Sequence, residues 1–150
     1  MTIYIGADHR GFELKEYLKT VLKNGGYDVV DVGAATYDKN DDFPDFARLV
    51  AEKVGDAPEI DRGVLICGSG FGMDIAANKY KNVRAALPAS ADHAAQSRHD
   101  DNVNVLAIAA DFTKEGTAEQ IVKTFLETPF AEDERYARRL EKIRQSELEK

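Results

Sequence analysis

The chain has 150 residues, the length of one ordinary domain, and 43% of them are hydrophobic and 31% charged, which is the balance of a globular protein. Its formal net charge of -7 argues against a nucleic-acid binder, because such a protein needs a basic surface to neutralise phosphates. The charge still permits one small anionic ligand, since a few local arginines can hold a phosphate.

Cysteine content and the first residues indicate a cellular setting. Cys67 is the single cysteine, so no intramolecular disulfide can form and a reducing compartment fits best. The opening Met1 to Ile5 lacks the basic segment of a signal peptide, and no apolar run approaches the roughly 18 residues of a membrane span. We therefore expect a cytoplasmic protein that does not contact membranes.

Hydrophobic patterning predicts strands and helices that alternate from end to end. Short β-branched or apolar runs predict strands, and apolar residues spaced by three or four predict helices. The expected strands are 3–5, 27–32, 63–67, 83–87 and 103–109. The expected helices are 12–22, 44–54, a short one through 75–77, one between the last two strands, 113–126 and 132–150.

This alternation predicts a single α/β domain over residues 1–150, a doubly wound, Rossmann-like, five-stranded parallel sheet with helices on both faces and an extra C-terminal helix. The last helix has few apolar positions. It either packs on a partner subunit or is a solvated terminal helix, and the pattern leaves both open.

Ligands bind such sheets at the carboxyl ends of the strands. Three polar segments are expected at that edge: 6–11 after the first strand, 67–72 after the third, and 99–104 before the fifth. The glycine-rich segment is Cys67-Gly68-Ser69-Gly70-Phe71-Gly72, whose backbone N–H groups at the start of a helix would stabilise negative charge, including a thiolate.

Each of these features has a plainer interpretation. A lone cysteine is often a small buried apolar residue, and Gly-x-Gly-x-Gly is only a weak dinucleotide signal, here after the third strand. Asp8 and His9 could bind a sugar or phosphate, or Asp8 could cap the following helix. Arg135 and Arg139 share a helical face and could clamp a phosphate, or pair with nearby glutamates. The histidines lack metal-ligand spacing, so no metal is expected.

Taken together, the chain resembles the ribose-5-phosphate isomerase B family, which includes the subunits of galactose-6-phosphate isomerase. The resemblance extends over nearly the whole length. Its segments are GADHRGFELK (6–15), DFPDFA (42–47), GVLICGSGFGMDIAANK (63–79), VRAA (83–86), NVLA (104–107) and residues 135–143.

The resemblance implies aldose–ketose isomerisation of a phosphorylated sugar through an enediolate, without metal or organic cofactor. It implies that Cys67 moves the proton and that Ser69, with the loop N–H groups of Gly68, Gly70, Phe71 and Gly72, holds the oxyanion. It further implies that Asp8 and His9 contact the sugar or its phosphate. Arg135 and Arg139 would bind phosphate from the last helix of a second subunit, in a homodimer or homotetramer with shared active sites.

The chain departs from the family pattern in one segment above all. Asp100 stands in place of the histidine that opens the sugar ring, His99 lies one position earlier, and Asp101 replaces an asparagine that contacts substrate. Asp111 also replaces a common arginine, and Arg10 a small residue. Either His99 still opens the ring, or the substrate needs no ring opening, as for a four-carbon sugar 4-phosphate. A non-catalytic sugar-phosphate-binding module of the same fold is the alternative function.

Overall fold

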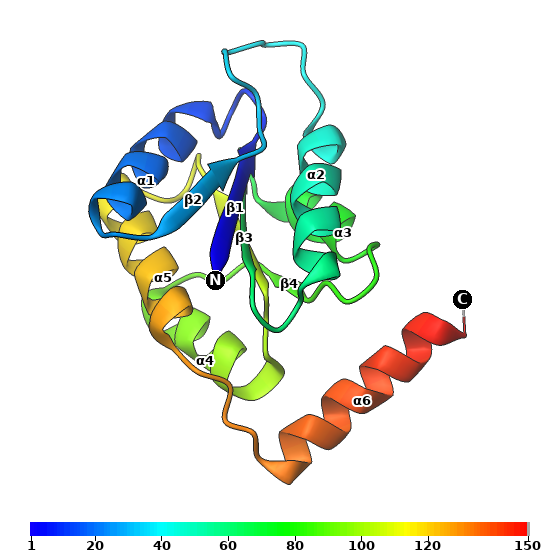
Figure 1. The fold of residues 1–150 in the computed structure, drawn as a ribbon. Coiled ribbons are helices and arrows are strands. Elements are labelled where there is room, and N and C mark those ends of the chain that lie inside the picture. The colour runs from blue at the N-terminus through cyan, green and yellow to red at the C-terminus, as the bar shows by residue number, and fades with distance from the viewer. Residues whose placement is uncertain (150) are drawn as a thin grey trace.

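The computed structural model describes residues 1–149 and confirms a five-stranded parallel sheet, with strand order β2-β1-β3-β5-β4 (Figure 1). The strands are β1 (Thr2–Ala7), β2 (Asp28–Asp31), β3 (Arg62–Cys67), β4 (Ala85–Ala86) and β5 (Val105–Ala109). The helices are α1 (Phe12–Asn24), α2 (Phe43–Asp56), α3 (Phe71–Ala77), α4 (Ala91–Asp101), α5 (Glu115–Glu127) and α6 (Glu134–Leu148).

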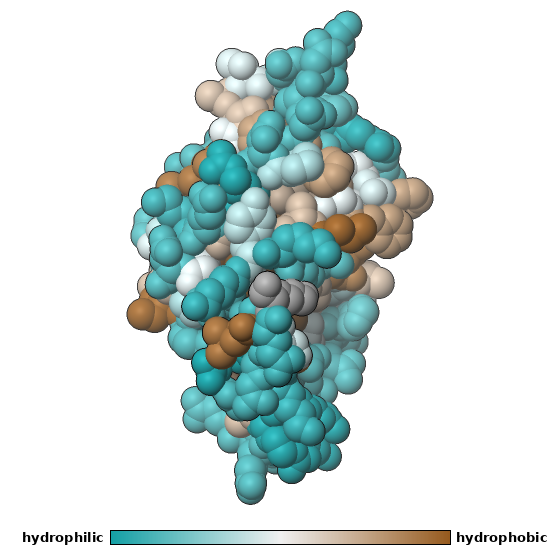
Figure 2. All heavy atoms as spheres, turned by 90° about the vertical axis from the view of Figure 1, so that its right-hand side faces the viewer, coloured by the Kyte–Doolittle hydropathy of each residue, from teal (hydrophilic) through white to brown (hydrophobic). Residues whose placement is uncertain are grey.

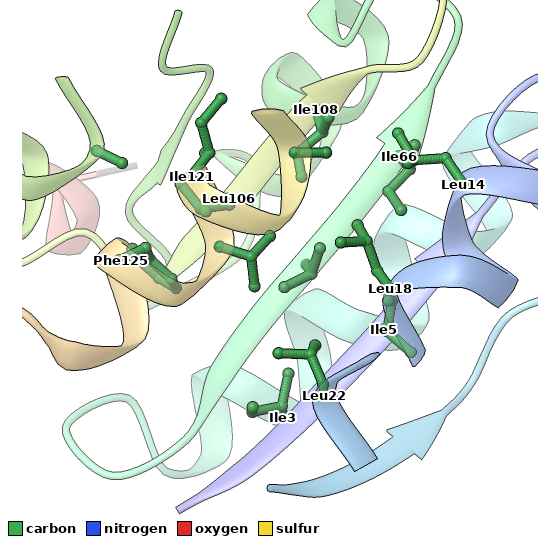
Figure 3. Packing of buried hydrophobic residues seen from close by; sticks show 14 of the residues in the cluster. Ile3, Ile5, Leu14, Leu18, Leu22, Ile66, Leu106, Ile108, Ile121 and Phe125 are labelled. Atoms are coloured by element: carbon green, nitrogen blue, oxygen red, sulfur yellow. The ribbon is translucent and has the colours of Figure 1, made fainter. Parts of the chain in front are cut away.

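Helices cover both faces of the sheet, and each face has its own apolar core. Side chains alternate across a strand, so Ile66 of β3 packs toward α1 and α5, as Figure 3 shows, whereas Leu65 and Cys67 pack toward α2 and α3. The first core contains Leu18 and Phe125, which are fully buried. The expected doubly wound architecture is therefore present, with β3 buried along its whole length.

The fourth strand is much shorter than the predicted 83–87. The backbone N–H of Val83 donates to Tyr80 in a turn, at 3.2 Å, and that of Arg84 donates to the side chain of Asn104, at 2.8 Å. Pro88 has no N–H to donate. Pairing with β5 is therefore confined to Ala85 and Ala86, at the edge of the sheet.

The last helix lies at the margin of the domain, as Figure 1 shows, and none of its residues is buried. Its surface is mostly hydrophilic (Figure 2). It begins at Glu134 and not at 132, because Glu132 has a φ of +54° and Asp133 caps the helix through the backbone N–H of Arg135. No helix within residues 1–149 combines the length and apolarity needed to cross a bilayer.

A buried lysine ties α1 to the edge of the sheet and to the loop that follows β2. The ammonium of Lys15 is fully buried, and it donates to Asp31 at 2.7 Å and to the carbonyl of Ala34 at 2.8 Å. Lys19 also donates to Asp31. Burial opposes ionisation of Asp31, but the hydrogen bonds from both lysines outweigh it and leave its pKa below the usual value. This ion cluster anchors the start of the loop over residues 33–42.

Candidate active site

The thiol of Cys67 lies at the carboxyl end of β3, 4% exposed, on the face of the sheet that α2 and α3 cover. The backbone N–H of Gly70 donates to its Sγ at 3.2 Å. Gly70 has a φ of +77°, a conformation that suits glycine, and this turn directs its N–H back toward the sulfur. The loop therefore places a hydrogen-bond donor on the sulfur, where it would stabilise a thiolate.

Backbone hydrogen bonds join the loops that follow the three central strands. Asp8 donates its N–H to Ile66, at 3.3 Å, just before Cys67. From the other side, the N–H groups of Ala110 and Asp111 donate to the carbonyls of Cys67 and Gly68, at 2.9 and 3.0 Å. The Cys67 loop is therefore held on both sides by the neighbouring strands, and Asp8 and Cys67 lie at the same edge, as expected.

Asp8 is buried, and its carboxylate accepts the backbone N–H groups of Arg10 and Gly11, at 3.0 and 3.1 Å. Burial raises the pKa of Asp8 above its usual value, although these hydrogen bonds act in the opposite direction. The N-cap of α1 is Gly11, so the interpretation of Asp8 as the helix cap is wrong: it caps the turn that leads into the helix.

His9 has a partner that the sequence reasoning missed. Asp41, near the end of the loop before α2, accepts the backbone N–H of His9 at 2.9 Å, and the same oxygen lies 2.7 Å from Nδ1 of the imidazole. Local sequence carries no signal for this contact, because the two residues are 32 positions apart and meet only through the packing of the loop on β1.

Arg10 and Asp111, two departures from the family pattern, form an ion pair with each other. The guanidinium of Arg10 crosses the backbone of Gly68, where a Cβ atom would overlap it. A side chain at position 68 would therefore displace the Arg10 guanidinium, and the Arg10–Asp111 pair spans the Cys67 loop between the ends of β1 and β5.

A hollow of about 410 Å³ adjoins the glycine loop. Ser69 and Phe71 line one side of it and Leu87 and Phe112 the other. Phe71 and Phe112 are 65% and 83% exposed, so the rim of this hollow is unusually apolar for a protein surface. Within residues 1–149, no group of three or more His, Cys, Asp or Glu side chains is placed to hold a metal ion.

The expectation that the segment 99–104 shares the edge with Cys67 is wrong. It precedes β5, so it lies at the amino ends of the strands, and His99 and Asp100 belong to the last turn of α4. Nδ1 of His99 lies 2.7 Å from a carboxylate oxygen of Asp100, and this hydrogen bond lowers the pKa of Asp100. One copy of the chain therefore holds the candidate residues in two groups, at opposite ends of the sheet.

The two predicted phosphate-binding arginines belong to the second group. Tyr136 joins them to His99: its ring meets the imidazole edge-on, with centroids 5.9 Å apart, and the guanidinium groups of Arg135 and Arg139 lie 4.8 and 5.9 Å from its centroid. Neither arginine forms an ion pair with a carboxylate within residues 1–149, so their alternative role as partners of glutamates is not what the structure has. Tyr136 was visible in the sequence only as one of the few apolar residues of this helix.

Asp101 is separate from both groups. It is exposed at the end of α4 and lines a hollow of about 650 Å³ between α4, β4 and α6, with Ile143 and Glu147 on the opposite wall. This hollow is larger than the one beside Ser69, but no Cys67-loop residue lines it. Within residues 1–149, no hydrogen bond or ion pair joins the Asp101 side chain to another candidate residue.

The sequence is similar to those of known sugar-phosphate isomerases over nearly its whole length. Residues 3–143 match the protein family described as Ribose/Galactose Isomerase. The chain is 45% identical over 147 residues to the probable ribose-5-phosphate isomerase B of Mycoplasma genitalium, covering 98% of this chain and 96% of the relative. It is 37% identical to the ribose-5-phosphate isomerase B of Mycobacterium tuberculosis, over 94% of this chain and 86% of the relative.

Solved structures show the same likeness. The crystal structure of ribose-5-phosphate isomerase B from Mycoplasma genitalium with bound ribulose-5-phosphate has a TM-score of 0.96 and 44% identity, covering 99% of this chain and 97% of that one. The type B ribose 5-phosphate isomerase of Trypanosoma cruzi has a TM-score of 0.93 and 41% identity over the full length of both chains. The chain belongs to the ribose/galactose isomerase family of aldose–ketose isomerases, on its ribose-5-phosphate isomerase B branch.

Proposed function

We propose that the chain interconverts ribose 5-phosphate and ribulose 5-phosphate, or a related pentose or tetrose phosphate, with Cys67 as the base. The observation that carries the proposal is the Cys67 thiol, which receives the N–H of Gly70 at the same sheet edge as Asp8. The chain that holds it matches, over 99% of its length, an isomerase with bound ribulose-5-phosphate. One base that removes and returns a proton on the same face suffices for this reaction.

The proposed reaction moves two protons and no other atoms. From the aldose, the Cys67 thiolate takes the proton on C2, and the electrons of that C–H bond form the C1=C2 double bond of an enediolate. Ser69 and the N–H groups of the glycine loop stabilise the negative charge on O1. The thiol then returns the proton to C1, and the O2 proton is transferred to O1, which gives the 2-ketose. Asp8 and His9 hold the sugar or its phosphate.

Of the two residues at the altered position, His99 is the better candidate to open the sugar ring. Its hydrogen bond lowers the pKa of Asp100, so that carboxylate is ionised near neutral pH and has no proton to donate to the ring oxygen. An imidazole can both donate and accept. We infer that His99 transfers the protons, and that Asp100 and the edge contact with Tyr136 orient it.

A complete site needs two copies of the chain. The Cys67 group and the His99 group lie at opposite ends of one sheet. Helix α6, which carries Arg135 and Arg139, buries no residue and contacts its own domain at α4 and at Asn82, whose N–H donates to Glu147. We infer a homodimer, or a homotetramer built from such dimers, in which the His99 group of each subunit faces the Cys67 group of the other. The phosphate is then held by guanidinium groups of the second subunit.

Cys67→Ala is expected to abolish isomerisation of ribose 5-phosphate, because no other base lies at this position, whereas Cys67→Ser keeps the shape and loses the acidity of the thiol. Turnover of ribose 5-phosphate and deuterium uptake from heavy water at the sugar carbon measure the reaction. Wild-type protein that binds the sugar without deuterium uptake would identify a pure binding module. Activity that survives in Cys67→Ala contradicts the assignment of the base.

His99→Asn is expected to lower kcat/KM for ribose 5-phosphate about 100-fold, the usual contribution of a general acid–base group. It should spare a tetrose 4-phosphate, which has no free hydroxyl positioned to close a furanose ring. Asp100→Asn, which retains an acceptor for the Nδ1–H of His99, serves as the matched control with a smaller loss. An unchanged rate on ribose 5-phosphate eliminates His99 as the residue that opens the ring.

Mixed dimers test whether the site is shared. Cys67→Ala and Arg139→Ala chains, coexpressed with different tags and isolated as mixed dimers, should recover about half of the wild-type activity, because one of the two sites is then complete. Each variant alone is expected to be nearly inactive. If the site lay within one chain, both sites of the mixed dimer would be damaged and no activity would return.

Asp8→Asn is expected to be more stable than the wild type at pH 7 and less active. The amide oxygen can still accept the N–H groups of Arg10 and Gly11, while the buried charge is removed. Because burial raises the pKa of Asp8, the carboxylate binds a proton more readily in the folded than in the unfolded wild type. Protonation removes the buried charge, so the difference in stability between the variant and the wild type should narrow as the pH falls toward 4. Urea unfolding at several pH values measures it, and a constant gap, or a less stable variant at pH 7, contradicts the expectation.

A further inference from the structure

The Asp41 carboxylate accepts hydrogen bonds from one residue within residues 1–149. Its side chain is only 10% exposed, and both hydrogen bonds that it receives within residues 1–149 come from His9, one from the backbone and one from Nδ1. Both end on Oδ1, and the buried Oδ2 has no partner in this part of the chain. Burying a carboxylate with one oxygen unsatisfied lowers the free energy of unfolding, so stability alone does not explain a carboxylate at this position.

The loop has other contacts besides those of Asp41. Its start is held by the bond from the Lys15 ammonium to Ala34, and its middle by Tyr37, whose ring meets the ring of Phe12 edge-on with centroids 6.3 Å apart. Asp38, in the same loop, shows how a carboxylate stabilises a turn alone: it is exposed and accepts the N–H of Asn40 at 2.9 Å. Asp41 instead reaches across to a residue of the site.

We propose that Asp41 is a positioning residue, which holds the imidazole of His9 in the Nδ1–H tautomer and leaves Nε2 free for the substrate. A carboxylate 2.7 Å from Nδ1 requires a proton on that nitrogen, so the neutral ring presents Nε2 as an acceptor and the protonated ring presents it as a donor. Asp8, beside His9 in the chain, and Tyr37, 6.3 Å away edge-on, are the other groups placed against this ring. The effect of this arrangement on turnover rests on the proposed function, whereas the assignment of the tautomer is independent of it.

The tautomer can be read directly from ¹⁵N-labelled histidine by NMR on the full chain without ligand. His93 is an internal reference for the other tautomer, because its Nδ1 accepts the N–H of Ala89 and its proton is therefore on Nε2. His9→Gln assigns the signal. We expect the Nδ1–H form of His9 in the wild type and in Asp38→Ala, and a shift toward the Nε2–H form in Asp41→Ala. An unchanged His9 signal in Asp41→Ala overturns the proposal.

Kinetics separate positioning from a structural effect. Asp41→Ala should raise KM for ribose 5-phosphate about fivefold to tenfold, the worth of one hydrogen bond, with a smaller change in kcat. Asp41→Asn, which keeps an acceptor, should restore most of the affinity, and Asp38→Ala should match the wild type.

A double-mutant cycle gives the decisive comparison, because Asp41→Ala should add nothing in a His9→Gln background. A full additional loss there would show that Asp41 acts other than through His9. If the wild type turned over no sugar phosphate, the proposed function would fail while the NMR result still stood.

Discussion

The parallel pairing of β1, β3 and β5 is the constraint on which the rest of the site depends. It puts Asp8 beside the residue before Cys67 and lets the N–H groups after β5 hold the Cys67 loop from the other side. The same pairing sends the end of α4 to the opposite edge, because a helix that connects two parallel strands must return to where the next strand begins. One feature of the sheet therefore explains both why Asp8 and Cys67 lie together and why the proposed function places the His99 group on a second subunit.

The sequence predicted the elements well where apolar periodicity was long, as in α1 and α2, and where an apolar run was continuous, as in β3. It failed at β4 and at the start of α6, because single hydrogen bonds from backbone N–H groups to the side chains of Asn104 and Asp133 decide those boundaries. It also placed His99 at the wrong edge, since a polar segment before a strand and one after it look alike until the direction of the strand is considered. The Asp41–His9 contact was beyond reach because it depends on how a loop packs.

Backbone hydrogen bonds from Ala110 and Asp111 hold the glycine loop, and side chains pack closely around it. Gly68 lies under the guanidinium of Arg10, and Gly72 lies against the ring of Phe43, so any side chain at either position would displace a neighbour. The buried Lys15 ammonium donates to the carbonyl of Ala34 and so fixes the start of the loop that carries Asp41. The donors that the proposed function assigns to the oxyanion are thus held in place without a ligand, and preorganised donors of this kind need little rearrangement when charge develops.

The exchange of a histidine for Asp100 raises the question of how a neighbour one position earlier could replace it. Successive residues of a helix point about 100° apart, so a direct substitution would aim the imidazole elsewhere. In this chain the side chains of His99 and Asp100 meet at 2.7 Å, which requires both to lean toward each other, and Tyr136 of α6 supports the ring on its edge. In the proposed mechanism the Asp100 carboxylate, which has no proton to donate, orients the imidazole of His99, which has one, and we propose the same relation between Asp41 and His9 at the other end of the sheet.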